Sequence, residues 1–183
     1  MTKESLLILK AMARQDNDAF TALVRMHQGK IRAYLFRLCK NYDVADDMAQ
    51  ETFITAFRKL NSYKGTGNFS GWLFSIAHNC FLQQLRRTKR HSEVTEQWGT
   101  EQEIHAERYD DISTEQMDLE QALSQLNPDE TATITLCHSY GFSHQEVSDI
   151  LGMPLGSVKS NISRGKAKLK KRLAVKEYLE KVS

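Results

Sequence analysis

The sequence predicts an all-α protein: two small helical domains joined by an acidic flexible linker, the C-terminal one a helix-turn-helix domain. Three observations carry this prediction. The 183 residues include only two prolines and nine glycines, and no stretch alternates apolar and polar residues as a strand would. Apolar residues instead recur at helical spacing. Formal charge is segregated into +8 over residues 1–90, −11 over 91–130 and +5 over 131–183.

The first domain, residues 1–90, is expected to open with a short helix, Lys3–Arg14, followed by three longer ones. The apolar stripe of the second helix is Phe20, Leu23, Val24, His27, Ile31, Tyr34, Leu35 and Leu38. Asp43 is the expected N-cap of the third helix, Val44–Leu60. The inward stripe of that helix is Val44, Met48, Phe53, Ala56, Phe57 and Leu60. Ser70 is the expected cap of the last helix, which ends in Arg86, Arg87, Lys89 and Arg90.

Residues 91–112 are polar and acidic without a sustained period, which predicts a linker. The second domain, residues 113–183, is defined by helix caps. Asn127, Pro128 and Glu130 supply an N-cap, a first-turn proline and an N3 acid. A second capping box is S-x-x-E at residues 143–146. Gly141 and Gly152 are the expected helix stops. With a first helix that Ser113 or Thr114 opens, four helices fit in this domain.

Residues 143–173 carry the most specific functional signal. A short capped helix, a glycine turn and a second helix form the plan of a helix-turn-helix, whose second helix enters the major groove of DNA. If Val158 and Ile162 face inward, the opposite face offers short hydroxyls and cations that suit phosphates and base edges. Those residues are Ser157, Lys159, Ser160, Ser163 and Arg164. The competing interpretation is a helical hairpin with a solvated basic tail.

Residues 63–90 interleave aromatic residues with glycines ahead of a basic helix end. This composition is typical of a surface that stacks unpaired bases while cations follow the nucleic-acid backbone. Aromatic residues at helical spacing are more often core, and that is the favoured interpretation for Trp72, Phe74 and Phe81.

A local acidic patch lies within the basic first domain. Asp47 and Glu51 are spaced i,i+4, an arrangement of like charges that costs a few tenths of a kcal/mol. With Asp43 and Asp46 nearby, the patch indicates a basic protein partner. A metal site is disfavoured because no histidine lies at matching spacing.

The motifs, apolar runs and cysteine spacing of the sequence exclude several classes of protein. No P-loop, G-x-S-x-G or H-E-x-x-H motif occurs and the six histidines are scattered, so we expect no enzyme activity and no cofactor. The longest apolar run, Leu6–Leu9, is too short to cross a membrane, which predicts a cytoplasmic protein without membrane insertion. Three cysteines without C-x-x-C spacing indicate neither disulfides nor a zinc site.

Taken together and in this order, these features resemble the extracytoplasmic-function (ECF) sigma factors of bacterial RNA polymerase. The resemblance runs from about Asp16 to Leu173 and is specific in three segments. They are DVADDMAQETFITAFRKL at residues 43–60, YKGTGNFSGWLFSIAHN at 63–79 followed by LRR, and PLGSVKSNISRGKAKL at 154–169. The family commonly has arginine at the position of His78, aspartate at that of Gln83 and alanine at that of Gly165.

The resemblance implies a role for each segment. The first domain would bind core polymerase and would recognise and melt the minus-ten promoter element; the second would recognise the minus-thirty-five element. The implied polymerase-binding residues are Asp46, Asp47, Gln50 and Glu51. The implied minus-ten and melting residues are Tyr63, Phe69, Asn79, Arg86 and Arg87, with Asn79 beside the pocket for a flipped base. The implied minus-thirty-five residues are Gly156, Ser157, Lys159, Ser160, Ser163 and Arg164.

The resemblance further implies three partners: core RNA polymerase, promoter DNA and a cognate anti-sigma factor. The predicted function is transcription initiation at specific promoters. Two alternatives remain at this point. One is a stand-alone helix-turn-helix regulator whose first domain dimerises or binds a ligand; the other is a helical adaptor whose acidic linker binds basic proteins.

Overall fold

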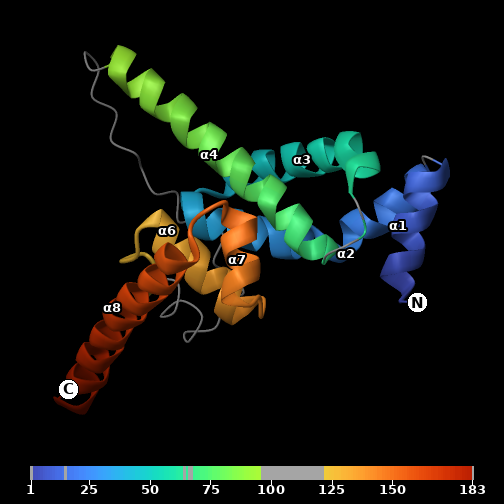
Figure 1. Ribbon diagram of the computed structural model, residues 1–183. Coiled ribbons are helices and arrows are strands. Elements are labelled where there is room, and N and C mark those ends of the chain that lie inside the picture. The colour runs from blue at the N-terminus through green and yellow to red at the C-terminus, as the bar shows by residue number, and fades with distance from the viewer. Residues whose placement is uncertain (1, 15, 64, 66–67, 96–121, 183) are drawn as a thin grey trace. The chain divides into compact units, whose positions relative to one another are not determined.

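The computed structural model describes residues 2–14, 16–63, 65, 68–95 and 122–182 (Figure 1). The chain forms two compact units, residues 1–103 and 104–183, which are described separately. Every regular element in the described ranges is helical, as the sequence predicts. The predicted linker, residues 91–112, lies outside the described residues from position 96 onward. Its first five residues continue the last helix of the N-terminal unit.

The N-terminal unit is a helical bundle. Its elements are α1 (Lys3–Arg14), α2 (Asn17–Cys39), α3 (Tyr42–Lys59), a short 3-10 turn η1 (Leu60–Ser62) and α4 (Phe69–Thr95). Helix α2 is central, because α1, α3 and α4 all pack against it, and α3 and α4 pack against each other. The C-terminal part of α4 projects from this bundle (Figure 1), and its described side chains are exposed from Leu85 to Lys89.

Two helix starts differ from expectation. Helix α3 is capped by Asn41, whose Oδ1 accepts the Val44 N–H at 3.0 Å, and not by Asp43. The α4 start uses Asn68, whose Oδ1 accepts the Ser70 N–H at 3.0 Å. In both places an asparagine two residues upstream takes the cap. Asn and Asp have similar cap preference, as do Asn and Ser, so residue type alone does not select between them.

The core of the N-terminal unit follows the predicted α2 stripe. Seven of the eight expected residues are buried and Val24 is half-buried. The predicted α3 stripe is confirmed at Met48, Ala56 and Leu60, which are buried, whereas Val44 and Phe53 are half-buried. It is wrong at Phe57, which is 43% exposed and packs edge-on against Phe20 at a centroid distance of 5.0 Å. The small residues Ala45, Ala49 and Thr52 complete the inward face.

The C-terminal unit contains α6 (Pro128–Ile134), a π-helical turn η2 (Thr135–Ser139), α7 (His144–Leu151) and α8 (Leu155–Val182) (Figure 1). Both predicted capping boxes are confirmed, Asn127 with Glu130 and Ser143 with Glu146. Gly152 ends α7 in the left-handed conformation at φ 63°, which glycine adopts without strain. The sequence therefore specifies both the start and the end of α7, the first helix of the helix-turn-helix.

Helix α8 packs closely on α6. Leu123, Leu126 and Ile134 form a small core with the half-buried Leu169 against it. At the crossing, a Cβ added to Gly165 would overlap Ile134 Cδ1. A side chain at residue 165 would therefore require the end of the Ile134 side chain to move.

Candidate functional site

The outward face of α3 carries the predicted polymerase-binding residues. Asp47, Gln50 and Glu51 are exposed and lie within one turn of the helix. Asp46 differs from them. Its carboxylate accepts two hydrogen bonds from Arg32, from Nε at 2.6 Å and from Nη2 at 2.7 Å. Asp46 therefore ties α3 to α2, and the acidic surface is centred on Asp47 and Glu51.

Two exposed apolar side chains extend this acidic surface. Ile54 is 45% exposed and follows Asp47 at i+7 and Glu51 at i+3, so it lies on their face. Phe57 is 43% exposed and follows Gln50 at i+7, at the edge of that face. Sequence reasoning missed Ile54 and assigned Phe57 to the core. The signal that could have identified Ile54 is its i+7 spacing from Asp47, which places Ile54 on the acidic face.

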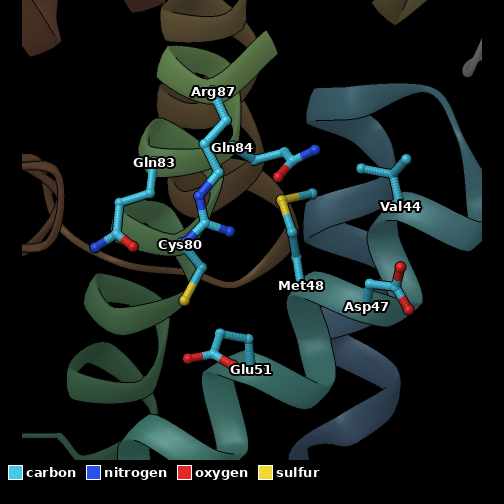
Figure 2. Close-up of a pocket in the computed structure, with 8 residues that line it drawn as sticks. All are labelled: Val44, Asp47, Met48, Glu51, Cys80, Gln83, Gln84 and Arg87. Carbon is cyan, nitrogen blue, oxygen red and sulfur yellow. The ribbon is translucent and has the colours of Figure 1, made fainter. Parts of the chain in front are cut away.

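A pocket of about 340 Å³ opens between α3 and α4 beside this surface (Figure 2). Its acidic wall comes from α3 and its basic and amide wall from α4. The lining residues are Val44, Asp47, Met48, Glu51, Cys80, Gln83, Gln84 and Arg87. Burial raises the pKa of the Cys80 thiol, so that thiol is protonated and a poor nucleophile. The pocket joins the acidic surface of α3 to the basic end of α4.

Two of the predicted minus-ten residues are buried. Tyr63 is 9% exposed and Phe69 is 3% exposed, with ring centroids 5.3 Å apart. Trp72 lies 5.3 Å from Tyr63 and 5.5 Å from Phe69, so the three rings form one cluster. In this conformation Tyr63 and Phe69 support the start of α4 and offer no ring face to a base. Phe74 and Phe81 are buried, which confirms the core interpretation for them.

The other predicted minus-ten residues are exposed along α4. Asn79 donates its Nδ2 to the Ser75 carbonyl at 2.9 Å, and Arg86 and Arg87 follow two turns later. The preceding residue, His78, is buried and its Nδ1 lies 3.0 Å from the Tyr34 hydroxyl. Where the family commonly has arginine, this chain therefore has a ring bound into its core.

The six predicted minus-thirty-five residues share the outward face of α8. Val158, Asn161, Ile162 and Gly165 are buried and define the inward face. At 100° per residue, the opposite side is centred on Gly156, Ser160 and Ser163. Its two edges carry Lys159 on one side, and Ser157 and Arg164 on the other. The result is a narrow strip of small residues between two cations, which allows a close approach to a groove.

A buried carboxylate lies beside this face and was not singled out from the sequence as more than a cap. Glu130 is 1% exposed, and its Oε2 accepts from Lys168 Nζ at 2.7 Å and from the Asn127 N–H at 3.1 Å. Burial acts to raise its pKa, but the hydrogen bonds from Lys168 and Asn127 outweigh burial and hold the pKa below its usual range. Lys168 is 38 positions away, a separation that helical periodicity cannot connect.

Within the described ranges, no three His, Cys, Asp or Glu side chains gather as a metal site would require. Among the helices that are described, none is long and apolar enough to cross a membrane. The surfaces of interest are therefore the acidic face of α3, the exposed side of α4 and the outward face of α8.

Each of the two units matches a model of a known protein family. Residues 23–91 match the model of sigma-70 region 2, and residues 116–169 match that of sigma-70 region 4. The chain is similar to the ECF RNA polymerase sigma factor SigE of Mycolicibacterium smegmatis, at 35% identity over 83% of this chain and 60% of the relative. It is also similar to SigW of Bacillus subtilis, at 31% identity over 90% of this chain and 94% of the relative.

Solved structures give the same result for the fold. The sigma factor RpoE of Bartonella quintana, solved in complex with the anti-sigma factor NepR, matches with a TM-score of 0.72 at 30% identity, covering 85% of this chain and 97% of that chain. CnrH, solved with the cytosolic domain of CnrY, matches in fold with a TM-score of 0.68 at 23% identity, covering 94% of this chain and 97% of that chain.

Proposed function

The chain belongs to the ECF sigma factors of bacterial RNA polymerase, and from that premise we propose which of its surfaces perform each step of promoter recognition. The acidic face of α3 docks on core polymerase, the exposed side of α4 meets the minus-ten element, and the outward face of α8 reads the minus-thirty-five element. The stand-alone regulator is not favoured, because region 2 and region 4 occur here in one chain.

Polymerase docking is supported by the composition of the α3 face. Exposed carboxylates of Asp47 and Glu51 attract a basic partner, and Ile54 and Phe57 supply apolar area that water otherwise covers. Isolated exposed apolar residues need no explanation, but Ile54 beside Asp47 and Glu51, with Phe57 at the edge of the same surface, gives a partner both charge and apolar area.

DNA reading is supported by the α8 face, the observation that carries the proposal. Its centre has only Gly156, Ser160 and Ser163, so backbone and hydroxyls can approach base edges, while Lys159 and Arg164 supply cations at the edges. On α4, Asn79 with Arg86 and Arg87 forms the surface for the opened strand. Tyr63 and Phe69 act there by supporting the helix start.

The chain contributes recognition and strand opening, while nucleotide chemistry belongs to the polymerase. Because its relative in B. quintana is bound by an anti-sigma factor, we infer that a partner of the same class covers this chain when it is inactive. Acting on polymerase, the protein works in the cytoplasm.

The decisive experiment adds the purified chain to core polymerase and a library of promoter fragments. We expect RNA synthesis from defined start sites, with transcripts absent when either component is omitted. Binding of the chain to DNA at a defined operator, with no specific initiation in the presence of core polymerase, would support the stand-alone regulator instead.

A further inference from the structure

The carboxylate of Glu130 is held by cations of α8. It lies 1% exposed at the start of α6, with Lys168 Nζ at 2.7 Å and Arg164 Nε at 3.6 Å. A buried carboxylate is stable only where its charge is matched and its oxygens accept hydrogen bonds. Here that match comes from the helix that carries the proposed DNA-reading face. Arg164 and Lys168, two exposed residues, thus form ion pairs with a buried group of the protein itself.

A second contact restrains the same arginine. Asn161 is 5% exposed, and its Oδ1 accepts from Arg164 Nη2 at 2.5 Å. The Nδ2 of Asn161 in turn donates to Met153 Sδ at 3.7 Å, in the turn between α7 and α8. The Arg164 guanidinium therefore makes an ion pair with Glu130 of α6 and a hydrogen bond with Asn161 of its own helix, although its side chain remains 59% exposed. A planar cation fixed in this way presents its remaining donors in one direction.

We propose that Glu130 is a positioning residue for promoter reading: it fixes Arg164 in one exposed orientation and keeps Lys168 away from DNA phosphates. This inference rests on the proposed role of the α8 face. A fixed guanidinium loses less conformational entropy when it meets its base edge, which favours the correct sequence. A lysine bound to a carboxylate neutralises no phosphate, which lowers affinity for every sequence alike. Glu130 therefore raises discrimination at the expense of total affinity.

A simpler role for Glu130 is to cap α6. The variant Glu130→Gln separates the two roles, because the glutamine amide oxygen can still accept from the Asn127 N–H while the charge is removed. Glu146 provides the matched control. It occupies the same N3 position in the capping box of α7 and is exposed, and its carboxylate accepts from the Ser143 N–H and hydroxyl, both at 2.8 Å. Glu146→Gln changes a cap without touching a cation of α8.

The experiment uses the full chain reconstituted with core polymerase. Holoenzyme is incubated with duplexes randomised over the minus-thirty-five region, and bound DNA is sequenced to give a preference at each base pair. Affinity for one unselected duplex is measured across a salt series. We expect Glu130→Gln to lower discrimination about 5- to 10-fold at the base pairs that Arg164 reads. Affinity for the unselected duplex should rise about 2- to 3-fold, and the salt slope should steepen by roughly 0.9, the value for one additional phosphate contact. Glu146→Gln should leave all three unchanged.

A double-mutant cycle tests whether Glu130 acts through Arg164. In an Arg164→Ala background, Glu130→Gln should cause no further loss of discrimination. Wild-type discrimination and salt slope in Glu130→Gln would overturn the proposal and leave Glu130 as a cap. If the wild-type holoenzyme enriches no sequence in the randomised window, the proposed function of α8 fails instead.

A pair of lysine variants keeps the proposal testable even if Glu130→Gln folds poorly. Lys168 and Lys170 are both exposed on α8, but only Lys168 is bound to Glu130, and Lys170 falls on the outward side. Lys170→Gln should reduce the salt slope by roughly 0.9, whereas Lys168→Gln should leave the slope unchanged. Equal reductions from both variants would show that Lys168 contacts DNA and would overturn the proposal.

Discussion

The outward faces of α3 and α8 are both exposed and polar, yet they are built in different ways. On α3, Asp47, Glu51 and two apolar side chains stand on a tightly packed helix of small inward residues. On α8, the centre is nearly bare, and Arg164 is held from beneath by Glu130 and Asn161. The first face offers area and charge to a protein. The second offers a few donors whose directions are fixed by buried groups.

This difference has an energetic consequence. Substitutions on the α3 face remove side chains that contribute little to folding, so binding should change while stability does not. Substitutions beneath the α8 face disturb a buried carboxylate and a close helix crossing, so reading and stability should change together. The largest expected effect is on α3 and the smallest beneath α8.

Reversing charge on α3 is the strongest test of its face. We expect Asp47→Lys combined with Glu51→Lys to weaken binding to core polymerase about 100-fold, or ~2–3 kcal/mol, because two attractive charges become repulsive. A titration with labelled core polymerase measures this change. Thermal unfolding should be nearly unchanged, because exposed substitutions alter stability by about 0.5 kcal/mol or less.

The matched control for that variant is Asp18→Lys combined with Asp149→Lys. Both residues are exposed, the net charge change is the same, and neither lies on α3. We expect binding within about 2-fold of wild type, because exposed charges that lie away from the interface are largely screened by salt. Similar losses of affinity in the two double variants would show that net charge, and not the α3 face, determines binding to core polymerase.

Asn79 combines properties of both faces, since it is exposed but tied to the Ser75 carbonyl. We expect Asn79→Ala to reduce open-complex formation about 10-fold while changing closed-complex binding little, because a flipped base meets the protein only after unpairing. Permanganate footprinting of melted thymines measures the first quantity and a low-temperature mobility shift the second. Thr88→Ala, exposed further along α4, serves as the control. Wild-type footprints would remove Asn79 from the melting surface.

How much the sequence could predict also differs between the two units. In the C-terminal unit, capping signals lie within four residues of the helix they start or stop, so Asn127, Ser143 and Gly152 mark boundaries that the structure confirms. In the N-terminal unit, two nearby residues of similar cap preference compete. The sequence prediction therefore selected Asp43 and Ser70, whereas the structure uses Asn41 and Asn68.

In the candidate site, the exposed residues could be predicted from the sequence, but their long-range contacts could not. Its exposed residues share one helix face, and a period of 3.6 is enough to group Ser160 with Ser163 or Asp47 with Glu51. The contacts that modify those residues join distant positions, such as Arg32 with Asp46 and Glu130 with Lys168. No local pattern encodes such a pair, because it exists only after the helices have packed.

The close crossing of α8 on α6 gives a stability test of the second face. An added Cβ in Gly165→Ala meets Ile134 Cδ1, and such overpacking costs ~1–3 kcal/mol, against a gain of about 1 kcal/mol in helix propensity. We therefore expect a net loss of about 1 kcal/mol. Ile134→Val removes the clashing methyl group, so it should restore stability in the Gly165→Ala background. Hydrogen exchange of α6 peptides measures both, and stabilisation by Gly165→Ala alone would show that Ile134 Cδ1 moves aside at little cost and that the crossing is not overpacked.

The smallest expected effect is the pH dependence of that crossing. The pKa of Glu130 is lowered from 4.5 in the folded chain, so the unfolded chain takes up a proton first as pH falls. The stability that Glu130 contributes is therefore fully present above about pH 4.5 and is lost as pH falls through the folded pKa. The change should be modest, since its partners Lys168 and Arg164 are 44% and 59% exposed and are screened by solvent.

Hydrogen exchange of α6 and α8 peptides between pH 3 and 6, corrected for intrinsic rates, should show a shallower pH dependence in Glu130→Gln than in wild type. Glu146→Gln removes another carboxylate with a lowered pKa in this unit, but it lies on α7, so it should leave the α6 and α8 profile unchanged. Identical profiles for wild type and Glu130→Gln would mean that the carboxylate is not paired in solution, and the two outward faces would then be built alike.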